Sequence, residues 1–493
     1  MNFSFLSESK EQITITSFPE NYQFFARGDD NKANINISGF VNSSIDSVII
    51  KVYHPEGIIR RSATLSRKNF SIDIKIEAIK HNYTMELYTK SKNQLGKECL
   101  VKKATHITVG DVYVINGQSN AWAIDYDNIY KDSLVSSYAK WIRTIGAMHV
   151  YNKPAVSPEA SDTHWYIANG KAPDIRNGAE LVGKGMVGVL GMNIGLNLVA
   201  SQGIPIAIIN GAGGGGGISF YQKTIDNDLN TPYGRLYNRL EASGLKHKIK
   251  AFIWNQGENN AGDSVNSYKD SLNKLYSNFK LDYTFEKFYL IQTPPGCNSK
   301  SGHQTVREAQ RQFADEKMDV CILTRHGFTE NPHTKNGSYF LDDGCHYHAH
   351  GYKVLASWIS SQAEFDFYKS KVNFEAPRLI NVKLESSKSL SIEFDKQIIV
   401  KGGGVEKYAM YSAKDYLFAS NNKRLTTIEE LVIDSLNPRK LTLISSIPIF
   451  NKGDKITHIL SDNYPLTQDA YQGPWLINPE TGVGAVGFTV TIK

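Results

Sequence analysis

The sequence has little of what marks several protein classes. It holds 4 cysteines in 493 residues, with no Cys-x-x-Cys spacing among them. No stretch reaches the ~18 consecutive apolar residues of a membrane-spanning helix. Basic residues (55) exceed acidic ones (49) by only 6. We therefore expect no zinc knuckle and no disulfide framework, and neither a nucleic acid nor a membrane as partner.

Two further absences bear on processing and on cofactors. The amino-terminal stretch MNFSFLSESKEQITITSF has no basic start followed by an apolar run, so the chain as given predicts no signal peptide. This leaves the compartment open: secreted or periplasmic if processed, otherwise cytoplasmic or virion-associated. No metal and no organic cofactor is expected, although His346, His348 and His350 alternate. We expect the four cysteines to be unpaired and to pack as small hydrophobic side chains; they are Cys99, Cys297, Cys321 and Cys345.

What is present is a folded composition, with 41% hydrophobic and 21% charged residues. The length predicts more than one domain. Residues 1–105 contain short alternating runs such as FSIDIKI and YTMELYTK, and residues 371–493 contain runs such as SLSIEFD and KLTLISS. Both regions are therefore predicted to be β-domains of sandwich-like type.

The middle region, 106–370, has a different rhythm. Continuous apolar runs that are typical of parallel strands buried on both faces alternate with helical patterns. This alternation predicts an α/β layer fold with a parallel sheet. The predicted strands are 112–116, 204–210, 251–255, 287–293 and 320–324, and the predicted helices are 264–280, 305–316 and 351–362.

Polar or glycine-rich segments stand next to these runs. They are Gly117–Asn120, Gly211–Gly217, Gln256–Asn260 and Asp342–Tyr347. In a parallel α/β sheet, ligands bind beyond the carboxyl ends of the strands. Four such segments at corresponding places therefore predict one shared site.

The residue types in these segments fit acyl transfer. A serine hydroxyl needs a neighbouring base to become a nucleophile, and His346 can be the base for Ser119. Asp343, three residues before the histidine, can fix the imidazole's tautomer. The intermediate carries an oxyanion that requires fixed donors. The backbone N–H groups of Ser119 and of a glycine such as Gly214 can supply them, with the Gln256 amide as a third.

Taken in order, these segments resemble the SGNH (GDSL-like) hydrolases, in the branch of sialate O-acetylesterases and related carbohydrate acetylesterases. The similar blocks are VGDVYVINGQSNAW, IPIAIINGAGGGGGISFY, IWNQGENNAG, VREAQ and the closing Asp343-Gly344-Cys345-His346. The resemblance covers about 106–365 and implies a three-layer α/β/α core. It also implies Ser119 as nucleophile, His346 as base, Asp343 as its orienting carboxylate, and Ser119, Gly214 and Gln256 as oxyanion hole.

The sequence departs from the family pattern at several positions. The glycine run is longer than usual and Gly216 replaces a small hydroxyl residue, so Gly215 is an alternative to Gly214. Asn259 rivals Gln256 as the side-chain donor, and Asp342 stands beside Asp343 as a competing carboxylate.

The predicted function is that of a serine esterase. It would remove O-acetyl groups from a carbohydrate, sialic acid or a polysaccharide, through an acyl-serine intermediate, so an O-acetylated glycan is the expected partner. One alternative is a glycan-binding capsule- or virion-associated module with weak or no esterase activity. Another is a lipase or thioesterase, which requires a large apolar acyl pocket.

Overall fold

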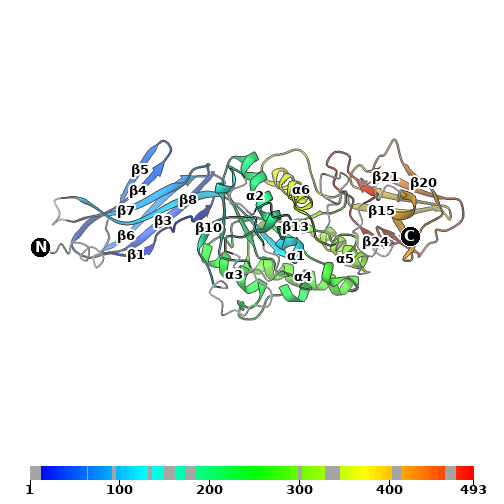
Figure 1. Ribbon diagram of the computed structural model, residues 1–493, viewed down its shortest axis with the longest axis horizontal. Coiled ribbons are helices and arrows are strands. Elements are labelled where there is room, and N and C mark those ends of the chain that lie inside the picture. The colour runs from blue at the N-terminus through cyan, green and yellow to red at the C-terminus, as the bar shows by residue number, and fades with distance from the viewer. Residues whose placement is uncertain are drawn as a thin grey trace.

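The computed structural model describes residues 13–63, 65–91, 96–130, 136–148, 161–172, 184–297, 302–327, 345–401, 412–460 and 473–493. Across these ranges the protein is mixed α/β, with a large mixed sheet and several smaller sheets. Figure 1 shows β-strands at both ends of the long axis and the helices between them. Among the described helices, none has the length and apolar character needed to span a bilayer.

The centre of the protein is a run of seven strands within the large sheet, in the order β10-β9-β11-β8-β12-β13-β14. All neighbouring pairs are parallel except the edge pair β10–β9. The five strands predicted from the continuous apolar runs are confirmed. The bounds are β8 Glu98–Gly117, β9 Ile142–Ile145, β10 Trp165–Ile167, β11 Ile206–Asn210, β12 Ile249–Asn255, β13 Phe285–Ile291 and β14 Val320–Leu323.

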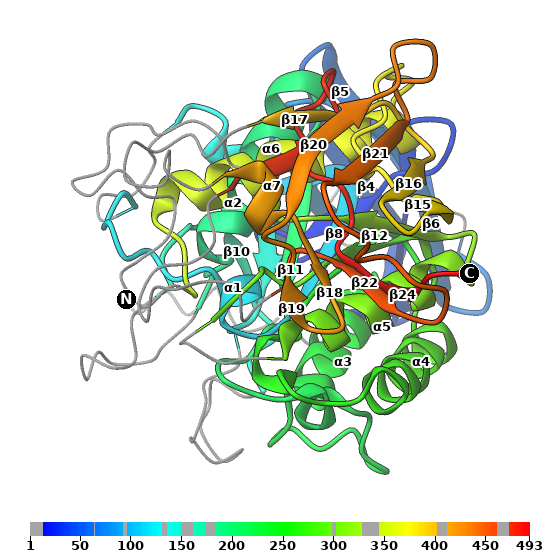
Figure 2. The same ribbon diagram turned by 90° about the vertical axis from the view of Figure 1, so that its right-hand side faces the viewer.

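The helices of this central part include the three predicted ones. α4 begins where the Ser264 side chain accepts a hydrogen bond from the N–H of Ser267, and it buries Tyr268, Leu272, Leu275 and Phe279. α2 packs against α6, and α4 packs against α5. Figure 2 shows α2 and α6 on one side of the central strands and α3 and α4 on the other. The bounds are α2 Gly188–Gln202, α3 Pro232–Ser243, α4 Val265–Asp282, α5 His303–Asp315 and α6 Ala349–Phe367.

The N-terminal strands form two sheets that share one buried core. In β6, Phe70, Ile72, Ile74 and Ile76 are buried and alternate with exposed residues, as the sequence pattern predicts. The first sheet is β1 Ile13–Ser17, β3 Lys32–Val41 and β6 Asn69–Glu77. The second holds β4 Ile45–His54, β5 Gly57–Ala63 and β7 Tyr83–Ser91, and continues through β8 into the central strands.

The same β8 carries the predicted boundary between 1–105 and 106–370. Its first half pairs with β7, its second half pairs with β11 and β12, and β2 (Phe24–Ala26) runs parallel to it. No linker therefore separates the N-terminal strands from the central sheet. The division of the chain into three domains stays a prediction.

The C-terminal strands form three small sheets around a second buried cluster. Val483 and Val486, however, belong to the main core, so this region packs directly onto the central part. The bounds are β15 Leu379–Ser386, β16 Ser389–Phe394, β17 Ile399–Lys401, β18 Phe418–Ser420, β19 Lys423–Arg424, β20 Ile428–Ile433, β21 Lys440–Ser445, β22 Lys455–His458, β23 Trp475–Ile477 and β24 Phe488–Thr491.

Candidate active site

Ser119 is the first residue of a short helix, α1 (Ser119–Trp122), directly after β8. The chain turns at Gly117, the last residue of β8, whose φ is +134°. A Cβ atom there would lie 2.1 Å from the carbonyl oxygen of Asn255 in β12, so this close approach requires glycine. The hydroxyl of Ser119 is thereby set at the carboxyl edge of the parallel strands.

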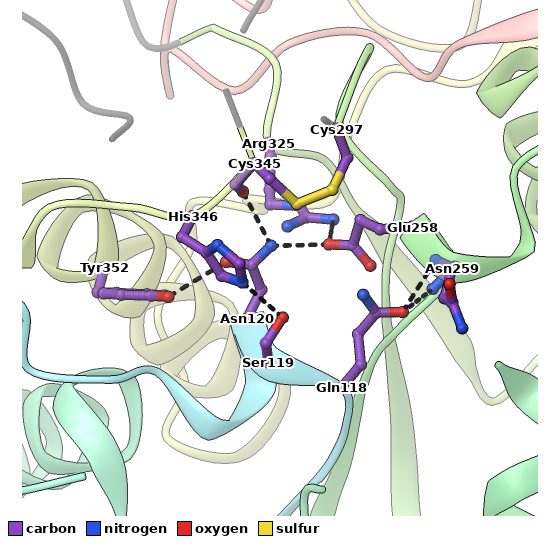
Figure 3. The surroundings of a disulfide bond; sticks show 11 residues. Gln118, Ser119, Asn120, Glu258, Asn259, Cys297, Arg325, Cys345, His346 and Tyr352 are labelled. Carbon is purple, nitrogen blue, oxygen red and sulfur yellow. Dashed lines mark hydrogen bonds and ion pairs between the residues drawn. A yellow bond between two sulfur atoms is a disulfide. The ribbon is translucent and has the colours of Figure 1, made fainter. Parts of the chain in front are cut away.

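The structure brings Ser119 and His346 together. Nε2 of His346 lies 2.8 Å from Oγ of Ser119, a hydrogen bond between residues 227 positions apart (Figure 3). The histidine stands just before α6, and its ring lies 5.8 Å from that of Tyr126. Asp343 and Asp342 lie outside the described residues, so the carboxylate of the predicted triad stays a prediction.

Asn120, next to the serine, joins the segments around the site. Its Nδ2 donates to Oε1 of Glu258 at 2.8 Å and to the carbonyl oxygen of Cys345 at 3.1 Å. Its Oδ1 accepts a hydrogen bond from the Tyr352 hydroxyl in α6. Asn120 is fully buried, so these contacts satisfy its polar atoms and fix four segments relative to one another.

Glu258 is a buried carboxylate with a buried partner. Oε1 of Glu258 lies 2.6 Å from a guanidinium nitrogen of Arg325, and neither side chain is more than 1% exposed. Burial alone would raise the pKa of Glu258, but the charge of Arg325 and the hydrogen bonds from Asn120 and Arg325 hold it below its ordinary value. Burial would likewise lower the pKa of Arg325, and Glu258 raises it. The pair is therefore ionised and supports Asn120.

The glycine-rich loop after β11 lies against the serine segment. The N–H of Gly213 donates to the carbonyl oxygen of Gly117 at 3.0 Å. A Cβ on Gly214 would lie 3.0 Å from the Trp122 ring, and Gly215 has a φ of +71°. The N–H of Gly214 donates to no atom of the described residues. As the first residue of α1, Ser119 also has an N–H without an intrahelical acceptor.

The two side-chain amides predicted as oxyanion donors point elsewhere. Nε2 of Gln256 donates to Oδ1 of Asn260 at 2.6 Å and to the carbonyl oxygen of Gly216 at 3.3 Å. Nδ2 of Asn259 donates to the carbonyl oxygen of Gly215 at 2.9 Å. Both amides thus hold the glycine loop against the loop after β12.

One expectation about the cysteines is wrong. Cys297, in the loop after β13, and Cys345, next to His346, form a disulfide, whereas Cys99 and Cys321 are not disulfide-bonded (Figure 3). The two bonded residues are 48 positions apart, and their proximity depends on how the loops after two different strands meet. No local spacing rule could have revealed the pair.

The alternating histidines have separate surroundings. Nδ1 of His348 lies 2.8 Å from Oδ1 of Asp127, and the N–H of Ala349 donates to the same carboxylate. The hydrogen bond from His348 lowers the pKa of Asp127 against the opposing effect of burial. Within the described ranges, no three His, Cys, Asp or Glu side chains are grouped as a metal site.

Sequence reasoning missed three contributors to this site. It gave no role to Asn120 although that residue stands beside the serine, and it did not connect Arg325 with Glu258. It also missed Gln118, whose Oε1 accepts hydrogen bonds of 3.3 Å from the N–H groups of Gly257 and Asn259. The position of Gln118, just before Ser119 in the predicted serine block, was the available signal.

Comparison with known structures shows the fold. A carbohydrate acetylesterase from Xanthomonas citri matches with a TM-score of 0.59 at 16% identity, over 97% of this chain and 99% of that chain. A protein from Arabidopsis thaliana matches with a TM-score of 0.36 at 19% identity, over 52% and 98%. A family two carbohydrate esterase from Cellvibrio japonicus matches with a TM-score of 0.29 at 11% identity, over 72% and 95%.

Comparison of the sequence alone gives the family. No curated protein matches the chain. The family described as "Carbohydrate esterase, sialic acid-specific acetylesterase" matches residues 109–363, slightly more than half of the chain. The resemblance found in the sequence blocks is thereby confirmed. The chain belongs to this family of carbohydrate esterases and is a carbohydrate O-acetylesterase.

Proposed function

We propose that the protein removes O-acetyl groups from a carbohydrate by serine-based acyl transfer. The observation that carries this proposal is the 2.8 Å contact between Ser119 Oγ and His346 Nε2 at the carboxyl edge of the central strands. A hydroxyl and an imidazole at this distance have the geometry of a nucleophile and its base. The family match adds the substrate class, an O-acetylated sugar.

In the first half of the reaction, Oγ of Ser119 attacks the acetyl carbonyl carbon while its proton moves to Nε2 of His346. The carbonyl oxygen then bears the negative charge of a tetrahedral intermediate. When the intermediate collapses, the sugar oxygen leaves and takes the proton from His346. The product is an acetyl ester on Ser119 and a free sugar hydroxyl.

In the second half, water attacks the acetyl-serine and gives its proton to His346. Collapse of the second tetrahedral intermediate releases acetic acid and returns the proton to Ser119 Oγ, and the acid then loses its own proton to solvent and becomes acetate. We assign Asp343 as the carboxylate that orients the imidazole, because it stands three residues before His346. No metal or organic cofactor enters any of these steps.

For the oxyanion hole we propose the N–H groups of Ser119 and Gly214. Both lack another acceptor among the described residues, and the glycine loop lies within contact of α1. Gln256 and Asn259 are less suited in this geometry, because their amide groups already donate to Asn260, Gly215 and Gly216. Two fixed backbone donors are enough to stabilise the charge.

The finer architecture is part of the same proposal. Helix pairs α2–α6 and α4–α5, with strands between them, support a three-layer core over 106–370. The two sheets over 1–105 share a buried core, which supports a sandwich-like N-terminal domain. We propose the C-terminal strands, 371–493, as a third domain with its own cluster.

The direct test is acetate release from a panel of O-acetylated glycans, including O-acetylated sialic acids, followed by NMR. We expect wild-type protein to release acetate and Ser119→Ala to lose at least about 10³-fold in kcat/KM. Ser277→Ala, an exposed position in α4, is the matched control and should be as active as wild type.

Equal, background-level rates for wild type and Ser119→Ala would overturn the proposal and favour a glycan-binding module. A series of esters from acetyl to octanoyl separates the acetylesterase from a lipase or thioesterase. We expect acetyl esters to be the best substrates, whereas rates that rise with acyl length would require a different acyl pocket.

A further inference from the structure

Cys345, the described residue just before His346, is held by two contacts to other parts of the chain. Cys345 is bonded to Cys297 through the disulfide, and its carbonyl oxygen accepts the 3.1 Å hydrogen bond from Asn120. Both cysteines are buried. Figure 3 shows the disulfide directly above the contact between His346 and Ser119. The position of the base thus depends on what holds its chain neighbour.

Two pairs of adjacent residues, Ser119–Asn120 and Cys345–His346, contact each other at both positions. Asn120 follows Ser119, and His346 follows Cys345, so the Asn120–Cys345 hydrogen bond lies beside the Ser119–His346 contact. The spacing between the two backbones therefore sets the spacing between nucleophile and base. The disulfide adds a covalent connection from Cys345 to the loop after β13.

On the carboxyl side, the same segment is held independently. α6 begins at Ala349, and Asp127 binds both the Ala349 N–H and Nδ1 of His348. Loss of the disulfide would remove the covalent connection of Cys345 to the loop after β13 and permit more movement beside His346. About 1 Å of misplacement can cost about 10²-fold in rate.

We infer that the Cys297–Cys345 disulfide is a positioning device that keeps His346 within reach of Ser119. Cys297 is a positioning residue, because it acts only through Cys345 and does not touch the reacting atoms. The inference rests on the proposed function, since it takes Ser119 and His346 as nucleophile and base. It gives the esterase a dependence on the oxidation state of two thiols.

The first test is whether the disulfide exists in the purified protein. Alkylation with iodoacetamide in denaturant, without reductant, should modify two cysteines, Cys99 and Cys321, and leave Cys297 and Cys345 joined in one peptide pair. Alkylation of all four cysteines would overturn the inference at once.

The second test is the kinetics of Cys297→Ser on p-nitrophenyl acetate, at a temperature where circular dichroism shows the variant folded. We expect kcat to fall about 10- to 100-fold while KM changes less than about twofold, because the disulfide positions the base without binding substrate. Cys99→Ser, which changes a cysteine outside the disulfide in the N-terminal part of β8, is the matched control and should match wild type.

A fluorophosphonate gives a readout independent of the substrate. Oγ of Ser119 bonds to phosphorus, fluoride leaves and the proton goes to the base, so the labelling rate should fall by the same factor as kcat. A disulfide that served only the overall stability of the fold would leave both rates unchanged in folded protein.

Reduction of wild type provides the reversible version of this experiment. Dithiothreitol supplies two electrons and two protons, which convert the disulfide into two thiols, and it closes to its own cyclic disulfide. Activity should fall as in Cys297→Ser and return on reoxidation. The inference would be overturned if Cys297→Ser and the reduced wild type were folded and kept the wild-type kcat. It would also be overturned if activity were lost only when the protein unfolds. Activity that survives in Ser119→Ala would instead overturn the proposed function.

Discussion

The two β-rich ends of the chain are attached to the central sheet in different ways. The N-terminal strands join it through β8, which pairs with β7 over Glu98–Ile107 and with β11 over Asp111–Ile115. Ser119 follows the other end of that strand. The N-terminal sheets therefore lie at the edge of the central strands opposite to the candidate active site.

The C-terminal strands instead meet the carboxyl ends of β13 and β14. The N–H of Gly484 donates to the His326 carbonyl at 2.9 Å, and the Thr324 hydroxyl donates to the Gly484 carbonyl at 2.7 Å. Gln292 exchanges two hydrogen bonds with the backbone of Gly487. These contacts flank Arg325, the partner of Glu258.

This difference in attachment indicates that the C-terminal end supports the candidate active site. From Gly484, the path runs through the 324–326 segment to Arg325, then to Glu258 and Asn120, the neighbour of Ser119. The N-terminal sheets connect to Ser119 along β8 itself, whose pairing with β7 ends at Ile107, 12 residues before the serine. Matched changes at the two ends should therefore separate activity from stability.

Among the changes that test this contrast between the two ends, Gly484→Ala should have the largest effect. The new Cβ would lie 2.4 Å from the Cβ of His326 and 2.6 Å from its carbonyl carbon, so the backbone beside Arg325 must move. We expect kcat to fall about tenfold and the free energy of unfolding to fall by about 1–3 kcal/mol. Steady-state kinetics and urea denaturation measure the two effects, and an unchanged kcat would refute the proposed path to the site.

The matched change at the other end is Gly39→Ala in β3. Its Cβ would lie 2.2 Å from the carbonyl oxygen of Thr14 and 2.9 Å from the Phe70 ring, a conflict as severe as that at Gly484. We expect a similar loss of about 1–3 kcal/mol in the free energy of unfolding, with kcat within about twofold of wild type. A tenfold loss of kcat in both variants would contradict the claim that only the C-terminal end supports the candidate active site.

The sequence predicted the strands and helices well, because each carries a local pattern. The continuous apolar runs gave β11, β12, β13 and β14, and the alternating run FSIDIKI gave β6. The continuity of β8 across the predicted boundary at 105/106 was not predictable. Hydrophobic patterns mark a strand, but the partners on each half of a long strand depend on distant segments.

For the candidate site, the sequence predicted which loops converge but not how each side chain is used. Ser119 and His346 meet as expected, since parallel strands deliver their following loops to one edge. The orientation of the Gln256 amide and the Cys297–Cys345 bond depend on contacts between loops. Neither has a local sequence signature.

Two buried histidines where the C-terminal strands pack onto the central part should make the stability of the protein sensitive to acid. His458 is fully buried, and burial lowers its pKa to about 4. The pKa of His326, which lies nearby, is also lowered, first by burial and then by the charge of Arg307. Between pH 6.5 and 4 the unfolded chain binds more protons at these histidines than the folded protein does. The stability they contribute is therefore complete above about pH 6.5 and falls as the pH drops.

For His458 alone, the free energy of unfolding should fall by about 1 kcal/mol between pH 6.5 and pH 5.5. Urea denaturation at a series of pH values measures the slope, and His458→Gln, which cannot take up this proton, should have a shallower one. If the variant kept the wild-type slope, His458 would not be a source of the acid sensitivity.

The smallest effect is expected at the junction between the N-terminal strands and α6. The Arg27 guanidinium binds both carboxylate oxygens of Asp111 at 2.9 and 2.7 Å, and the Tyr368 hydroxyl donates to the same carboxylate. Lysine keeps the charge but cannot form the two-pronged contact, so Arg27→Lys should lower the free energy of unfolding by about 0.5–1 kcal/mol. Lys75→Arg, at an exposed ion pair with Asp30, is the control and should leave stability unchanged. Because this junction lies at the amino ends of the central strands, kcat should equal that of wild type in both variants. A measurable loss of kcat in Arg27→Lys alone would show that the N-terminal end influences the candidate active site.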